Sequence, residues 1–260
     1  PGFIVMLVEG LGAEHLSIAG YDRETTPALG AFASRALFYP YVYSPAPDTA
    51  AACMSLLTGL HPLAHGYLGP YRGPLPDSVQ TLPEVLQQRG YATAAFSEGL
   101  AGDDEDLVFG SGFERGFEWF NPDYPLVTPP SATPGRIEPA GSEVTLRRAA
   151  EWIEAHQDLQ FFVFIRLREL RQFQRLSRYG EGFLGRGRTP TPRDIYDTAL
   201  ADVDKRIGAF LDRMGAIPAL EKTCIVITSP HGFDFSEPGR GEWRRGGPGL
   251  RNLSESALRV

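Results

Sequence analysis

Three continuous apolar runs constrain the fold of this chain most strongly. They span residues 3–8, 161–165 and 223–229, and none alternates apolar with polar residues along its centre. Alternation is typical of a sheet with one solvated face, whereas a continuous apolar run is typical of a strand buried on both faces, as in parallel sheets. The three runs therefore predict the buried strands of a parallel sheet.

Segments with helical character separate these strands. Residues 194–214 and 143–156 carry apolar side chains at helical spacing, and shorter helices are expected at 28–36, 50–57 and 82–88. Further strands are expected at 37–43 and 91–97, whereas the stretch 121–141 is rich in Pro and Gly and is expected to be irregular. This order predicts an α/β fold, a three-layer αβα sandwich around a mostly parallel central sheet.

Polar residues follow the apolar runs where each strand should end. Glu9, Glu169 and His231 hold these positions. In open α/β sheets, ligands bind beyond the carboxyl ends of the strands. We therefore expect Glu9, Thr49, Glu169 and His231 to converge in one cleft at this edge.

Composition limits the classes of function. The 260 residues are 42% hydrophobic with a net charge of −7, which suits a single domain over 1–260 and argues against a nucleic-acid partner. No run of about 18 apolar residues occurs, so membrane anchoring is expected only through segments outside this sequence. Both ends look cut within strand-like residues, so the domain is expected to be truncated at both ends.

Five segments, in chain order, resemble motifs of the sulfatase branch of the alkaline phosphatase superfamily. Residues 20–27 are close to the family's Y-G-Y-x-R-x-T-T-P-N-L, and residues 44–66 resemble S-x-A-P-x-T-x-P-S-x-A-S-L-L-T-G-x-x-P-x-x-H-G. The other three segments are 8–17, 161–172 and 225–239. The resemblance implies a sulfatase-like αβα domain, in which a divalent metal and a helix N-terminus hold a sulfate or phosphate ester.

Several positions that carry the family's chemistry differ in this sequence. The resemblance places a metal ligand on Glu9 in place of Asp, the nucleophile on Thr49, and a second metal ligand on His231 beside Pro230, which replaces an Asp. Thr cannot become the formylglycine of sulfatases, and Pro has no side-chain ligand atom. Cys53 falls on the motif's Arg position and is expected to be a small buried helix residue.

Three functions stay open. The first is a catalytically degenerate sulfatase-like domain that acts as a structural or binding subunit, without a cofactor and with other protein subunits as partners. The second is a metal-dependent phosphoesterase or phosphotransferase that uses Thr49 with Ca, Mg, Mn or Zn, for which Asp48 or Asp234 would have to complete the metal site.

The third is a site for an anionic group, at the N-terminus of the helix that begins near Thr49. Three arginines, Arg166, Arg168 and Arg171, would contribute to it, although the plainer alternative is that they are exposed loop charges. Bacterial members of the family are often exported, so a periplasmic or extracellular location, possibly at a membrane, is expected.

Overall fold

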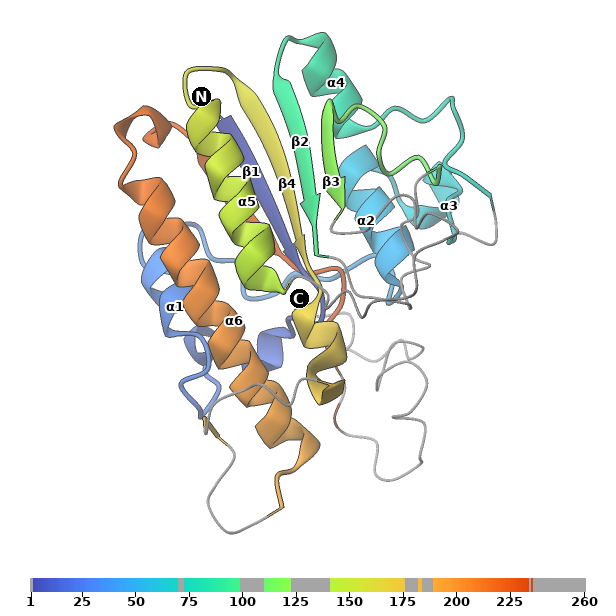
Figure 1. The fold of residues 1–260 in the computed structure, drawn as a ribbon. Coiled ribbons are helices and arrows are strands. Elements are labelled where there is room, and N and C mark those ends of the chain that lie inside the picture. The colour runs from blue at the N-terminus through green and yellow to red at the C-terminus, as the bar shows by residue number, and fades with distance from the viewer. Residues whose placement is uncertain are drawn as a thin grey trace, which may run out of the picture.

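The computed structural model describes residues 2–69, 73–98, 110–122, 141–175, 182–183, 189–233 and 235. Its centre is a sheet of five strands in the order β3-β2-β4-β1-β5, and every pairing is parallel (Figure 1). The strands are β1 (Gly2–Val8), β2 (Ala92–Ser97), β3 (Trp119–Pro122), β4 (Phe161–Leu167) and β5 (Cys224–Thr228). The predicted α/β fold with a mostly parallel sheet is confirmed.

Helices cover both faces of the sheet (Figure 1). On one face lie α1 (Pro27–Ala33), α5 (Ser142–Ala155) and α6 (Pro192–Gly215); on the other lie α2 (Thr49–Thr58), α3 (Pro62–His65) and α4 (Leu82–Gln88). Short 3-10 helices span Ala13–His15, Ser17–Ala19, Glu169–Arg175 and Pro218–Leu220. We call the two sides of the sheet the α5/α6 face and the α2 face.

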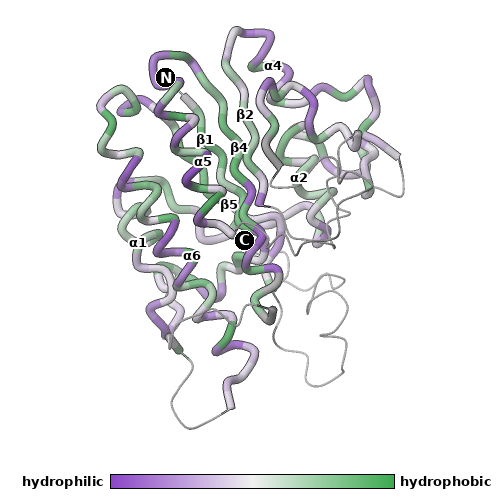
Figure 2. Tube along the Cα trace, viewed as in Figure 1, coloured by the Kyte–Doolittle hydropathy of each residue, from purple (hydrophilic) through white to green (hydrophobic). Residues whose placement is uncertain are grey.

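Alternation along each strand divides the core into two clusters. From β4, Phe161, Val163 and Ile165 join the cluster on the α5/α6 face, whereas Phe162 and Phe164 join the cluster on the α2 face. The strands β1, β2 and β4 are hydrophobic along most of their length, and polar residues gather on the outer helices (Figure 2). Both faces of the central strands are therefore buried against apolar side chains, as the continuous apolar runs predicted.

Two segments differ from the sequence-based expectation. Residues 37–43 form no strand beyond an isolated bridge at Tyr43, and Leu37 is 84% exposed. Conversely, the edge strand β3 (Trp119–Pro122) extends two residues into the stretch 121–141 that was expected to be irregular. An edge strand tolerates Pro because one side of its backbone needs no partner.

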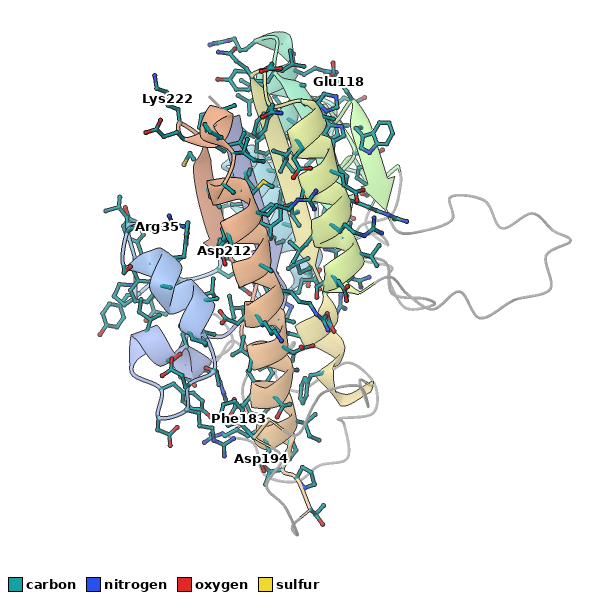
Figure 3. All side chains as sticks on the ribbon, turned by 60° about the vertical axis from the view of Figure 1, so that its left-hand side comes forward. Arg35, Glu118, Phe183, Asp194, Asp212 and Lys222 are labelled. Carbon is teal, nitrogen blue, oxygen red and sulfur yellow. The ribbon has the colours of Figure 1, made fainter. Side chains whose placement is uncertain are left out.

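The motif at residues 20–27 belongs to the scaffold. Asp197 of α6 accepts hydrogen bonds from Tyr21 Oη and Arg23 Nη1, each at 2.7 Å, and contacts His15 Nδ1 at the same distance. Figure 3 shows Asp194 and Phe183 at one end of α6 and Asp212 farther along it. The segment after β1 is thus tied to the first turns of α6.

Candidate functional site

Strand alternation aims Glu9 and Arg166 at the same side of the sheet. Leu7 of β1 and Phe164 of β4 lie on the α2 face, so Glu9 and Arg166, two residues further on, face the same way. The backbone N–H of Glu9 donates to the carbonyl oxygen of Leu167 at 2.8 Å, which extends the ladder past the end of β1. The two side chains therefore meet at the carboxyl edge of the sheet.

Three guanidinium groups surround the Glu9 carboxylate. Arg166 Nε donates to Glu9 Oε1 at 2.5 Å, Arg168 Nε lies 3.6 Å from the same oxygen, and Arg171 Nη1 lies 3.5 Å from Glu9 Oε2. Glu9 and Arg168 are fully buried, and the side chain of Arg171 is 20% exposed. We call Arg166, Arg168 and Arg171, together with Glu9, the arginine cage.

The burial of two of these arginines contradicts one expectation from the sequence. Arg166 and Arg168 are not exposed loop charges, because Arg166 is only 1% exposed and is paired with Glu9. Arg166 belongs to β4 itself, and Arg168 follows that strand directly. A buried guanidinium is strongly disfavoured without an anionic partner, which Glu9 provides.

The charges around Glu9 hold it ionised. Burial raises the pKa of this carboxyl group, but the guanidiniums of Arg166, Arg168 and Arg171 and the nearby His231 lower it more, to about 2. At neutral pH the cage therefore holds one carboxylate against three guanidiniums among the described residues.

Thr49 opens α2 on the same side of the sheet. Asp48 is the N-cap, and its Oδ1 accepts the N–H of Ala51 at 3.0 Å. Ala50 packs in the same cluster as Leu7 and Phe164, so the first turn of α2 lies over the α2 face. The Thr49 hydroxyl is buried and has no hydrogen-bond partner among the described residues.

His231 follows β5 and is buried beside Phe233. Its Nδ1 lies 3.1 Å from the carbonyl oxygen of Gly232, and its charge contributes to the lowered pKa of Glu9. Pro230 precedes it, and Asp234 lies outside the described residues. Asp48, the other acid considered for a metal site, is occupied as a helix cap.

These residues do not fit a divalent cation. A hard cation needs several oxygen ligands, whereas the Glu9 carboxylate is already bound by guanidiniums and Pro230 offers no ligand atom. In the described part of the chain, no group of three or more His, Cys, Asp or Glu side chains is arranged to hold a metal.

Glu169 lies elsewhere than expected. Its Oε2 accepts hydrogen bonds from Ser142 Oγ at 2.5 Å and from Arg206 Nη1 at 2.6 Å, so it joins the N-terminus of α5 to α6. Residue 169 begins the 3-10 helix that follows β4, and its contacts with α5 and α6 place its carboxylate on the α5/α6 face. Glu169 therefore does not share the side of the sheet that carries Glu9.

Glu98 was missed by the sequence analysis. It follows β2 as Glu9 follows β1, and its Oε2 accepts the backbone N–H groups of Arg168 at 2.6 Å and Glu169 at 3.1 Å. Burial and the neighbouring Glu169 raise its pKa to about 8, although its backbone hydrogen bonds and Arg168 oppose this shift. An acidic residue directly after an apolar strand was the available signal.

Two other expectations have outcomes in the structure. Cys53 is a buried residue of α2, as expected. No helix within the described ranges is long and apolar enough to cross a membrane. The motif residues 237–239 lie outside the described residues.

Known proteins resemble this chain over nearly its whole length. The sulfatase family model matches residues 1–257. N-acetylgalactosamine-6-sulfatase of Canis lupus familiaris is 24% identical over 93% of this chain and 52% of its own length, and arylsulfatase A of Homo sapiens is 26% identical over 93% and 54%. The chain thus spans about half the length of these relatives.

A solved structure shares the fold. The C-terminal periplasmic domain of EcEptC from Escherichia coli, in complex with Zn, has a TM-score of 0.67 at 18% identity, over 91% of this chain and 65% of that one. With a family match that covers residues 1–257 and an αβα fold built as its motifs predicted, this chain belongs to the sulfatase family.

Proposed function

We propose that this domain binds a sulfate or phosphate ester without a metal and does not hydrolyse it, so that it serves as a binding or structural subunit. The arginine cage around Glu9 carries this proposal, because it puts guanidinium charge where the family resemblance implies a divalent cation. Arginine binds tetrahedral oxyanions through paired N–H donors, so it can replace the metal in holding an ester but not in activating a nucleophile.

The first turn of α2 supports the same proposal. Backbone N–H groups and the helix dipole at an N-terminus favour an anion. The buried Thr49 hydroxyl, which has no hydrogen-bond partner among the described residues, is a donor that an oxyanion would satisfy.

Titration with sulfate tests the proposal directly. Isothermal calorimetry in the presence of a chelator should detect sulfate binding to the wild-type chain. Arg171→Gln removes the most exposed guanidinium of the cage and should weaken binding about tenfold, the lower range for a lost hydrogen bond to a charged group. Arg89→Gln, at an exposed position distant in sequence, is the charge-matched control and should leave affinity unchanged. An absence of sulfate binding would contradict the proposed function.

One observation favours the alternative of a metal-dependent phosphoesterase or phosphotransferase. Thr49 stands at the first position of a ten-residue helix, where a nucleophile of this family would be placed by resemblance. The discriminating assay uses aryl sulfates and phosphate mono- and diesters with Ca, Mg, Mn and Zn. We expect no turnover; robust turnover that Thr49→Ala abolishes would establish the alternative.

Partners and location also remain proposals. We infer that the domain associates with other protein subunits, since a domain that binds an ester without hydrolysing it must act through the molecules that it binds. The periplasmic origin of the EcEptC domain supports a periplasmic or extracellular location here. Recovery of the native protein as a stable complex from a membrane or periplasmic fraction would support both inferences, and recovery as a cytoplasmic monomer would contradict them.

A further inference from the structure

His65 joins the short helix α3 to α2, which lies beside it (Figure 1). It is the last residue of α3, it is fully buried, and its Nε2 lies 3.1 Å from the hydroxyl oxygen of Ser55 in α2. Its Nδ1 accepts the backbone N–H of Tyr67 at 3.1 Å. Tyr67 is also fully buried and belongs to the core cluster on the α2 face. One imidazole ring therefore links α2, α3 and the segment that follows α3.

These contacts fit the neutral imidazole in one tautomer. A backbone N–H can only donate, so Nδ1 must offer its lone pair to Tyr67, and the ring proton lies on Nε2, where it donates to Ser55. A second proton would have to bind at Nδ1 and would set two N–H donors against each other. Burial lowers the pKa of His65 below its ordinary value of 6.5, and His61 adds to this shift, whereas a hydrogen bond to the backbone of Ala51 opposes it.

The surroundings of His65 offer no anionic partner that would favour its charged form. α2 carries two titratable side chains, Asp48 at its cap and Cys53 in the buried cluster, and Asp48 is occupied with the N–H of Ala51. On α3, the side chain of His61 caps the helix. Among the described residues, no carboxylate forms an ion pair with His65. A proton on Nδ1 would therefore be disfavoured by both the hydrogen bonds and the burial of the ring.

We propose that His65 is an acid-sensitive latch, which holds α3 and Tyr67 against α2 while its imidazole is neutral and releases them when the imidazole is protonated. Release would break the hydrogen bond to Tyr67 and withdraw a side chain from the first half of α2. The first turn of that helix carries Thr49, so acid would loosen the support of the candidate site. The inference does not depend on what Thr49 binds.

The latch should open as the pH falls. Because the pKa of His65 is lowered in the closed form, the open form binds a proton that the closed form excludes. The stabilisation by the latch is therefore fully present above pH 6.5 and is lost as the pH falls through the lowered pKa. Between these two values, the opening constant should rise about tenfold for each pH unit.

Amide exchange of Tyr67 measures this opening, because its N–H is freed when Nδ1 no longer accepts it. We would follow exchange by NMR from about pH 7.5 to pH 5 and correct it for the intrinsic pH dependence of exchange. The wild-type opening constant should rise below pH 6.5. His65→Asn keeps an acceptor near the place of Nδ1 and cannot be protonated, so its opening constant should stay level.

His61→Asn is the matched control, since Asn also caps a helix and the variant removes the other histidine of this region. It should retain the rise of the opening constant at low pH. An opening constant that is independent of pH in the wild type, or that rises equally in His65→Asn, would overturn the latch.

A second measurement keeps the test valid if His65→Asn does not fold. The ¹⁵N chemical shifts of the wild-type ring should show a proton on Nε2 and none on Nδ1 at pH 7.5, and should titrate with a pKa below 6.5. A proton on Nδ1 at pH 7.5, or a pKa of 6.5 or higher, would contradict the proposal. Neither result bears on the binding of sulfate, so the latch and the proposed function can fail separately.

Discussion

The two faces of the sheet place carboxyl groups in opposite electrostatic environments at the same carboxyl edge. On the α2 face, three guanidiniums surround the carboxylate of Glu9. On the α5/α6 face, the carboxyl groups of Glu98 and Glu169 interact with each other, and Arg206 donates to Glu169. The same chemical group thus has a pKa of about 2 at Glu9 and about 8 at Glu98.

The difference between the two faces arises from the directions in which a few neighbouring side chains point. Along β4 and the turn after it, Arg166 and Arg168 face α2, whereas Glu169 faces α5 and α6. A shift of one residue in register would exchange the faces and leave both sets of charges without partners. Burial then amplifies the difference, since neither edge is screened by solvent.

The largest expected effect follows from removing the carboxylate of the cage. Glu9→Gln leaves three guanidiniums around a neutral amide, and we expect the free energy of unfolding to fall by about 3–5 kcal/mol, as when one partner of a buried ion pair is lost. Denaturant unfolding measures this, with the exposed Glu221→Gln as control. Added sulfate should restore part of the loss; an unchanged free energy would contradict the buried cage.

The other face should respond to pH with a defined sign. The pKa of Glu98 is raised above the unfolded value of 4.5, so its contribution to stability is fully present below pH 4.5 and is lost as the pH rises through about 8. We expect the free energy of unfolding to fall by a few kcal/mol over this window from this group. Glu98→Gln should remove that slope in denaturant titrations at several pH values; an identical slope in both proteins would show that Glu98 is not neutral at pH 7.

A smaller effect is expected where α5 and α6 meet. Arg206→Gln removes the ion pair with Glu169, leaving that carboxylate to Ser142, and should lower the free energy of unfolding by about 1–3 kcal/mol. The double variant with Glu169→Gln provides the control: additive losses would show that the two side chains do not interact.

The smallest effect concerns the N-terminus of α2. Asp48→Ala removes the cap of Ala51 and should lower the free energy of unfolding by about 1 kcal/mol. Asp48→Asn keeps a capping oxygen and should behave as the wild type. An equal loss in both variants would indicate that the charge of Asp48, and not its hydrogen bond, stabilises the helix.

The sequence alone determined the layers of the fold and the place of the site. Continuous apolar runs specify strands buried on both faces, and a cap such as Asp48 specifies a helix start, because these signals act over a few neighbouring residues. The order of motifs identified the family, and polar residues after buried strands marked the edge where Glu9 lies.

Only the tertiary structure decided what those residues do. Whether Arg166 meets Glu9, 157 positions away, depends on the register of β1 against β4, and no local pattern encodes it. The face that Glu169 takes, and its bond to Arg206 of α6, depend in the same way on packing between distant elements. The opposite pKa shifts of Glu9 and Glu98 follow from burial and neighbouring charge, which exist only once the sheet and its two layers of helices are assembled.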